Sequence, residues 1–183
     1  ILTVNAGSSS IKLSLYARIN GKLTRQLAGK IEHIGKSSAW LIVKQNESED
    51  QVDLHAAGFS PVIKSLIKWL GSQDWFDKVY AIGHRIVHGM DHTKAAIITR
   101  ELLNELNSFM DYDPDHLPSE IEIIKILKKQ YPHLIQVACF DTAFHSTLPT
   151  IAKMFAIPAK YYREGIRRYG FHGISYSYLL QAL

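Results

Sequence analysis

The N-terminal end of the chain constrains the fold most tightly, because strand-like patterns flank a turn of small residues. Ile1–Val4 is a short apolar run. Ile11, Leu13 and Leu15 alternate with more polar neighbours in the period of a half-buried strand. Asn5–Ser10 lies between these two segments and consists of small, turn-forming residues. The pattern therefore predicts two strands joined as a tight hairpin.

Beyond this hairpin, the sequence predicts further strands and then an alternation of strands and helices. Strands are expected at 27–34, 40–43, 51–54, 79–82 and 134–140, and helices at 60–71, from about 100, at 119–130 and from about 174. Ser60 and Ser119 are expected to cap two of these helices, the second with Glu122 in a capping box. Strands first, followed by alternating elements, indicate an α/β domain around a mixed sheet.

Composition narrows the function classes. The chain has 183 residues, of which 46% are hydrophobic and 21% charged, as in an ordinary globular protein. It has no apolar run near the roughly 20 residues that a membrane helix needs, and no secretory signal is visible. The net charge of +4 is scattered, so neither a nucleic acid nor a membrane is an expected partner. The single cysteine, Cys139, is expected in the core of a cytoplasmic protein.

Three candidate sites fall at predicted strand ends, where ligands of α/β sheets gather. They are Asn5–Ser8, the pair His84 and Arg85, and Asp141. Glycine and serine in the first segment expose N–H groups and hydroxyls that can hold phosphate oxygens, with Lys12 adding positive charge nearby. A plain hairpin turn made of the same residues remains the alternative. The segment is not a P-loop, because the Gly-Lys-Ser/Thr ending is missing.

The segment 84–89 offers two kinds of chemistry. Arg85 carries a planar fork that fits a carboxylate or phosphoryl group, although it could instead form a surface ion pair. His84, His88 and His92 are spaced by four residues, which on a helix would make a metal triad and, with Asp141, a metallohydrolase. This reading is the weaker one, because the strand-like residues within the segment argue against a helix.

Two further segments carry polar groups suited to catalysis. Asp141 in 140–145 could bind Mg²⁺ or cap a helix. His172 in 167–173 lies between glycines that would present its imidazole at the surface, or it could be a structural histidine. A hydrolase triad is disfavoured, because there is no G-x-S-x-G elbow. Together the four segments supply a phosphate-binding turn, an arginine, a metal-binding carboxylate and a histidine, which are the parts that phosphoryl transfer requires.

These motifs resemble those of the acetate kinase family. Ile1–Lys12, Ala81–Gly89, Phe140–His145 and Arg168–Gly173 are similar to four family motifs and occur in the same order. The resemblance implies an actin-like ATPase (ribonuclease H-like) domain with a mixed five-stranded sheet and flanking helices. It also implies that residues 1–183 form the N-terminal domain of a two-domain kinase. The nucleotide-side domain would be largely absent, so the chain alone is expected to be inactive.

The resemblance further implies reversible transfer of a phosphoryl group from ATP to acetate, with Mg²⁺ and by direct in-line attack. The residues with implied catalytic roles are Arg85, Asp141 and His172. The implied Mg²⁺ ligands are Asn5 and Asp141. A homodimer is implied for the full-length protein.

The resemblance also assigns residues to binding. The implied phosphate- and ATP-side residues are Asn5, Ser8, Ser10 and Lys12. The implied acetate-side residues are Arg85, Val87, His116 and Phe171. Two positions depart from the family pattern, since Met90 replaces a usual glycine and Asp115 replaces an apolar pocket residue. These departures leave open a kinase for another short carboxylate such as propionate, or a non-catalytic binding domain of the same fold.

Overall fold

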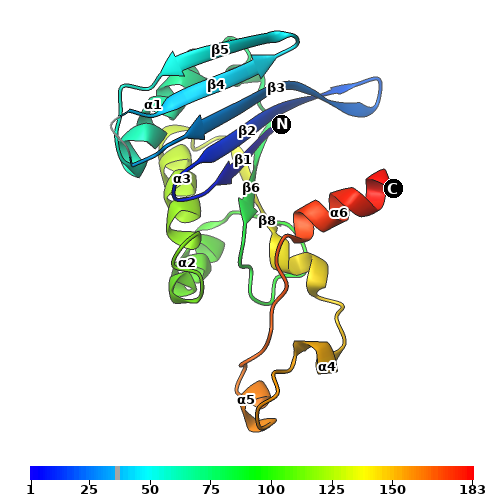
Figure 1. Cartoon of the computed structure of the whole chain (residues 1–183). Coiled ribbons are helices and arrows are strands. Elements are labelled where there is room, and N and C mark those ends of the chain that lie inside the picture. The colour runs from blue at the N-terminus through cyan, green and yellow to red at the C-terminus, as the bar shows by residue number, and fades with distance from the viewer. Residues whose placement is uncertain (36–37) are drawn as a thin grey trace.

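The computed structural model describes residues 1–35 and 38–183, and its centre is one mixed sheet (Figure 1). The strands are β1 (Leu2–Ala6), β2 (Ile11–Ile19), β3 (Lys22–Glu32), β4 (Trp40–Gln45), β5 (Ser48–Asp53), β6 (Ala81–Ile86), β7 (Ala96–Ile97) and β8 (Ile135–Phe140). The helices are α1 (Phe59–Gly71), α2 (Arg100–Ser108), α3 (Leu117–Gln130), α4 (Thr150–Lys153), α5 (Lys160–Arg163) and α6 (Gly173–Ala182). Short 3₁₀ turns occur at Phe76–Lys78, Met110–Tyr112 and Asp141–His145, the last called η3 below.

The strand order confirms an α/β domain with a mixed sheet, but the expected number of five strands is wrong. In the part of the chain that the structure describes, eight strands run in the order β5-β4-β3-β2-β1-β6-β8-β7. The first five form an antiparallel meander, whereas β1, β6 and β8 are parallel neighbours. The additional strands arise because the β4–β5 hairpin extends one edge and β7 pairs with β8 at the other.

Two apolar clusters hold the helices on the sheet. The larger joins one face of strands β1–β4 and β6 to α1 and α3, and includes Leu2, Ile82 and Leu66. The smaller joins α2 and α3 to β6 and β8 around Leu106 and Ile124. Parallel strands are joined by crossover connections, which place helices on the face of the sheet and cover it. The carboxyl ends of β1, β6 and β8 therefore come to one edge of the domain.

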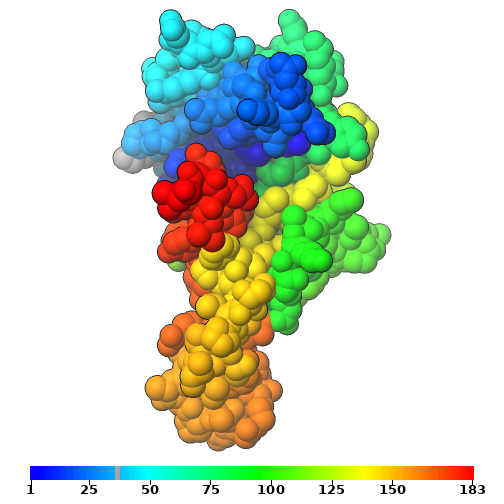
Figure 2. Space-filling model, turned by 90° about the vertical axis from the view of Figure 1, so that its right-hand side faces the viewer, coloured from blue at the N-terminus to red at the C-terminus, as the bar shows by residue number. Residues whose placement is uncertain are grey.

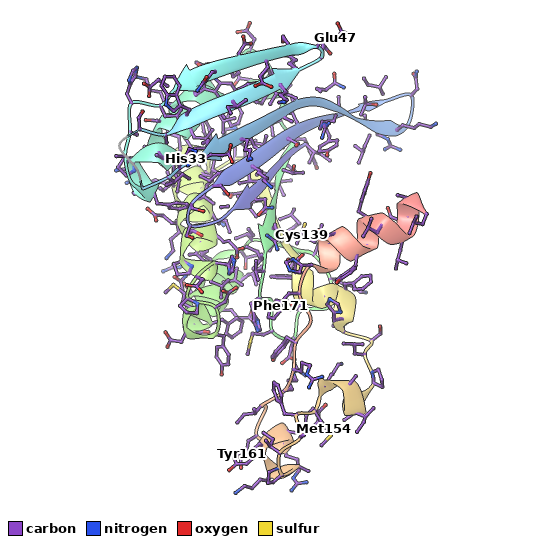
Figure 3. The ribbon with its side chains drawn as sticks, in the orientation of Figure 1. His33, Glu47, Cys139, Met154, Tyr161 and Phe171 are labelled. Carbon is purple, nitrogen blue, oxygen red and sulfur yellow. The ribbon has the colours of Figure 1, made fainter. Side chains whose placement is uncertain are left out.

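The C-terminal part of the chain lies away from these clusters. Residues 146–171, which contain α4 and α5, project from the body as an extension (Figures 1 and 2). The chain then returns, and α6 packs on η3 beside the end of β8. Met154 and Tyr161 mark the extension in Figure 3, and Phe171 lies where the chain rejoins the body.

Several sequence predictions of detail need correction. Helix α1 has Gly58 at its N-cap, so Ser60 lies inside the helix. Helix α3 begins at Leu117 with His116 at its N-cap. Pro118 suits the first turn, and the His116 carbonyl already accepts from the Glu120 amide. Ser119 therefore lies inside α3, where its hydroxyl donates to the His116 carbonyl, and no capping box forms.

Strand boundaries also shift in ways that affect the site. The strand expected at 79–82 is β6, which runs to Ile86 and so includes Arg85.

Cys139 is a free thiol on β8, as expected from its being single, but it is only half-buried rather than a core residue. Burial still raises the pKa of this thiol. None of the helices within the described ranges is long and apolar enough to cross a membrane.

Candidate active site

The turn between β1 and β2 forms one wall of the candidate site. The Gly7 amide donates to the Ser10 carbonyl at 2.8 Å, which closes a tight turn with Ser8 exposed. Asn5 and Lys12 are paired residues on the two strands beneath this turn. The turn lines a cavity of about 270 Å³ together with Arg85 and His116. The predicted phosphate-binding residues therefore meet the predicted arginine at one place.

Arg85 is held in position by two side chains from neighbouring strand ends. Its Nε and Nη2 donate to Oδ2 of Asp141 at 2.9 and 2.6 Å, and its Nη1 donates to Oδ1 of Asn5 at 3.3 Å. The Asp141 carboxylate is 1% exposed, whereas the arginine side chain is 26% exposed. A guanidinium has five N–H donors, so three are used here and two are left for an anion.

His84 precedes Arg85 but serves a different purpose. Successive side chains of a strand point to opposite faces, so His84 faces the α3 side while Arg85 faces the site. The His84 Nε2–H donates to the amide oxygen of Gln136 at 2.8 Å. Burial lowers the pKa of His84 to about 4, against which the Gln136 contact acts only partly. His84 is therefore a neutral core residue that ties β6 to β8.

Asp141 combines an ion pair with a helix cap. Its Oδ2 receives the two Arg85 bonds, while its Oδ1 accepts from the Ile174 amide at 3.1 Å. Ile174 lies in the first turn of α6, so the carboxylate satisfies one free N–H there and lies at the positive end of the helix. From the sequence, Asp141 could bind a metal or cap a helix. The structure shows that it caps α6, whose first turn lies more than 30 residues further along the chain.

His172 and Phe171 lie where the extension rejoins the body. His172 is exposed at the N-cap of α6 with a φ of 59°, and it lines a cavity of about 530 Å³ with Lys12, Arg85 and Cys139. Figure 3 places Cys139 on β8 near the start of α6. Phe171 is 40% exposed, and its ring centroid lies 5.7 Å from that of His88. The two cavities share Asn5, Lys12 and Arg85, so they adjoin at the strand ends.

Val87 and His116 differ in how much surface they offer. Val87 is 7% exposed, so its side chain is almost wholly enclosed. The ring of His116 is about half exposed and lines the smaller cavity, while its Nδ1–H donates to Asp113 at 2.8 Å. Its Nε2 has no hydrogen bond to another described residue, so it is available to a ligand. Asp115 is exposed and is not among the residues lining either cavity.

The metal triad weighed from the sequence is not formed. His84 is bonded in the core, and His88 packs against Tyr169 and Phe171. His92 stacks on Phe140 at a centroid distance of 4.7 Å. Within residues 1–35 and 38–183, no three His, Cys, Asp or Glu side chains lie together as a metal site. The metallohydrolase interpretation is therefore wrong, because the segment is a strand and a loop rather than a helix.

Sequence reasoning missed two carboxylates beside this site. Asp113 orients His116, and Glu120 is 1% exposed with both oxygens accepting from the Val87 amide at 3.2 and 3.3 Å. Glu120 was recognisable, because it lies on the apolar stripe of α3 between Leu117 and Ile124. A lone acid on such a stripe is unusual unless a buried donor needs it.

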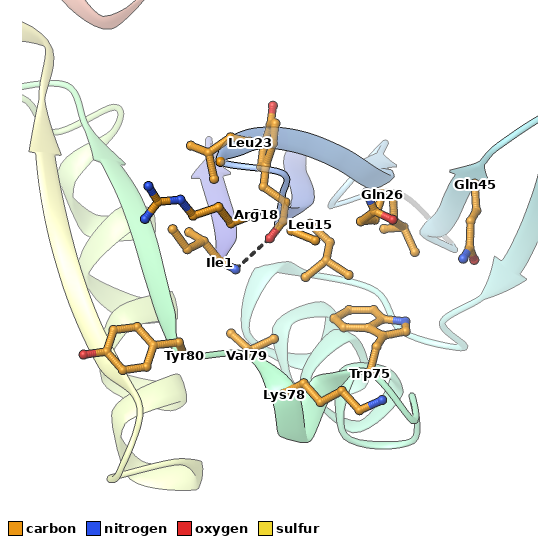
Figure 4. A pocket seen from close by; sticks show the side chains of 14 residues that line it. Ile1, Leu15, Arg18, Leu23, Gln26, Gln45, Trp75, Lys78, Val79 and Tyr80 are labelled. Atoms are coloured by element: carbon orange, nitrogen blue, oxygen red, sulfur yellow. Dashed lines mark hydrogen bonds between the residues drawn. The ribbon is translucent and has the colours of Figure 1, made fainter.

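A cavity larger than these two lies elsewhere, at the amino ends of β1 and β6. Its volume is about 870 Å³, and Leu15, Trp75, Val79 and Tyr80 supply much of its lining (Figure 4). The Ile1 amine donates to the Tyr16 carbonyl at its edge. None of the residues to which the resemblance assigns a catalytic, binding or metal role lines this cavity.

Comparison with known proteins agrees with the motifs. The Acetokinase family model matches residues 1–183. The chain belongs to this family. It is 37% identical over 193 residues to an acetate kinase of Rhizobium meliloti, covering 100% of the chain and 48% of that protein. It is 38% identical over 190 residues to an acetate kinase of Nitrobacter hamburgensis, covering 100% of the chain and 46% of that protein. The chain thus spans about half the length of the curated relatives it matches.

Solved structures of the acetokinase family have the same fold. A propionate kinase from Francisella tularensis superposes with a TM-score of 0.86 at 33% identity, covering 97% of this chain and 46% of the other. An acetate kinase from Porphyromonas gingivalis gives a TM-score of 0.81 at 27% identity, covering 96% and 45%. The actin-like ATPase fold that the motifs imply is therefore confirmed.

Proposed function

We propose that the complete protein containing this chain is an acetate kinase. It transfers a phosphoryl group from ATP to a carboxylate oxygen of acetate and gives acetyl phosphate and ADP in a reversible reaction. The observation that carries this proposal is Arg85, which is fixed by Asn5 and Asp141 and still has two N–H groups free beside the Gly7–Ser10 turn. A planar guanidinium suits both the carboxylate of acetate and the phosphoryl group during its transfer.

The chemistry needs positioning and charge neutralisation more than proton transfer. Acetate is already an anionic nucleophile, so no general base is required, and attack proceeds in line on the terminal phosphorus. Arg85 would neutralise charge on the reacting oxygens, and His172 would steady the equatorial oxygens, with His116 nearby. Val87 and Phe171 would enclose the methyl group of acetate, although neither residue lines the two cavities at the strand ends.

The turn residues would serve the phosphate side of the site. Ser8, Ser10 and Lys12 surround the smaller cavity with Asn5, and they bring hydroxyls and one positive charge to it. Asn5 and Asp141 would hold Mg²⁺ through oxygen atoms, which this ion prefers. In the structure the Asp141 carboxylate is 1% exposed and both of its oxygens accept hydrogen bonds from Arg85 and Ile174, so Mg²⁺ would have to replace at least one of these contacts. Bound Mg²⁺ would supply charge neutralisation on the phosphate oxygens.

The proposal extends to the rest of the protein. Residues 1–183 would form the N-terminal domain of a two-domain kinase, and a nucleotide-side domain would complete the cleft. The chain alone would then not turn over. A cytoplasmic location and a homodimer belong to the same proposal, the former supported by the free thiol of Cys139.

Propionate is the second candidate acceptor. One similar solved structure is that of a propionate kinase, and its fold covers 97% of this chain. A carboxylate with one more methylene would bind Arg85 in the same way, so only the enclosure around the acyl group would discriminate between the two acids.

Replacement of Arg85 tests the proposal in the complete gene product. Arg85→Ala should lower kcat for acyl phosphate formation by at least ~10²-fold, the scale observed when one transition-state donor is removed. Asp141→Ala should do the same, since Asp141 holds the guanidinium. Arg25→Ala, an exposed arginine on β3, is the matched control and should leave the rate unchanged. Near-normal turnover of Arg85→Ala would remove this residue from the mechanism.

A further inference from the structure

Glu120 is a buried acid that the proposed chemistry does not use. It lies in the first turns of α3 and is 1% exposed. Both of its carboxyl oxygens accept from the main-chain N–H of Val87, at 3.2 and 3.3 Å. Val87 is the residue that follows β6, two positions after Arg85. The carboxyl group therefore contacts the backbone that carries the proposed carboxylate-binding arginine.

The backbone at this point depends on side chains for its hydrogen bonds. Pairing between β6 and β8 ends at Ile86 and Phe140, so the Val87 amide has passed the last strand partner. Glu120 supplies the acceptor for Val87, and Thr142 supplies one for Gly89 at 3.0 Å. A buried amide without an acceptor is destabilising, so these side chains determine where the strand end lies.

We propose that Glu120 is a positioning residue for the carboxylate-binding site: its buried carboxyl group fixes the main chain at Val87 and, through it, the Arg85 guanidinium. This inference rests on the proposed function for its substrate and on the observed contacts for its geometry. It assigns Glu120 no contact with the substrate.

The charge of Glu120 matters because of its neighbours. Burial raises its pKa to about 8, the Val87 amide and Arg85 act against this rise, and Asp113 and Asp141 add to it. Among the described residues, the charges that act on Glu120 come from Asp113 before α3, Arg85 on β6 and Asp141 after β8. Strand β1 and helices α1 and α2 also pack against α3 but contribute none. At pH 7 the group is therefore an uncharged acid beside a cation.

Ionisation of Glu120 would weaken the site. A negative charge on α3 would join that of Asp141 near Arg85, and the guanidinium would then hold an anionic ligand less well. The KM for acetate should therefore rise as pH passes through 8, by about 10-fold, if one neighbouring charge is worth about one pKa unit.

The test compares three variants of the complete gene product between pH 6.5 and 9. Glu120→Gln keeps an acceptor for the Val87 amide but cannot ionise, so its acetate KM should stay flat where that of the unmodified protein rises. Glu120→Ala removes the acceptor, so its KM should be raised throughout the range. Glu122→Gln, two residues along α3, is the matched control and should keep the unmodified profile.

A second measurement separates this inference from the proposed reaction. Binding of inorganic phosphate, measured by calorimetry over the same pH range, reports the anion site without requiring turnover. Weakening above pH 8 in the unmodified protein but not in Glu120→Gln would support the inference even if no acyl phosphate formed. An unchanged acetate KM or an unchanged phosphate affinity in Glu120→Ala would overturn it, because the site would then not need the contact between Glu120 and the Val87 amide.

Discussion

Ionisation of Glu120 should make the stability of the domain depend on pH. The pKa of this carboxyl group is about 8 in the folded protein, mainly because of burial, against 4.5 for an ordinary glutamate. Because the folded-state pKa is the higher one, the folded protein keeps a proton that the unfolded chain releases above pH 4.5. The stability contributed by this group is therefore fully present below pH 4.5 and is lost as pH rises through 8.

The size of the effect follows from the two pKa values. At 1.36 kcal/mol per pKa unit, the burial of Glu120 lowers the free energy of unfolding by about 3 kcal/mol at pH 7 and about 5 kcal/mol well above pH 8. Glu120→Gln retains an oxygen for the Val87 amide and does not ionise. Its advantage over the unmodified chain should grow by about 3 kcal/mol between pH 5 and pH 8.

Urea unfolding at pH 5 and pH 8 measures this difference. Fluorescence of Trp69 and Trp75, which pack against the larger apolar cluster, reports loss of the domain. Comparing the two proteins cancels the contributions of other titrating groups, and Glu122→Gln controls for the loss of one acid from α3. A constant difference between Glu120→Gln and the unmodified chain at the two pH values would refute the reasoning.

Three further predictions concern backbone strain, close packing and the central ion pair. Met90 has a left-handed φ of 47°, so Met90→Gly should be about 1 kcal/mol more stable than Met90→Ala in urea unfolding, and equal stabilities would contradict this. A Cβ at Gly173 would collide with the Asp141 carbonyl and with Phe144. Gly173→Ala should therefore lower the thermal midpoint and reduce the free energy of unfolding by roughly 1–3 kcal/mol. Gly83→Ala is the control, because its Cβ would meet nothing within 4 Å, and it should leave the midpoint unchanged. Asp141→Ala leaves a guanidinium without its partner and should cost about 3–5 kcal/mol by urea titration, whereas a change below 1 kcal/mol would mean the pair is dispensable for stability.

Most of the sheet was predictable because its strands carry a simple signal. The N-terminal hairpin follows from residues of period two on either side of a turn of small residues, and the structure has it as β1 and β2. The two-residue strand β7 carries no such signal, because periodicity cannot be read from Ala96 and Ile97. It exists only because β8 offers a free edge there.

Helix starts were less predictable than helix bodies. The start of α2 and the C-terminal ends of α1 and α3 lie close to their predicted positions. Ser60 and Ser119 looked like caps, but serine is also tolerated within a first turn, and the backbone around His116 starts α3 earlier. Capping motifs identify a residue type, whereas the true boundary is set by which N–H groups find partners.

The candidate site was predicted as a set of strand ends, and the structure brings those ends together. Asn5, Arg85 and Asp141 are joined by hydrogen bonds, as the carboxyl-end rule suggested. The same strand pattern could have shown that His84 and Arg85 face opposite sides, so only one of them faces the site. The role of Glu120 depends on a tertiary contact with Val87 that no local pattern specifies.

Acyl phosphate formation by the complete gene product tests the central claim most directly. The protein should be given ATP and Mg²⁺ with acetate, propionate and butyrate in parallel, and acyl phosphate should be trapped and quantified. We predict ATP-dependent product with at least one of the three acids and its loss in Arg85→Ala. A folded protein that binds ATP yet forms no acyl phosphate with any of them would contradict the account.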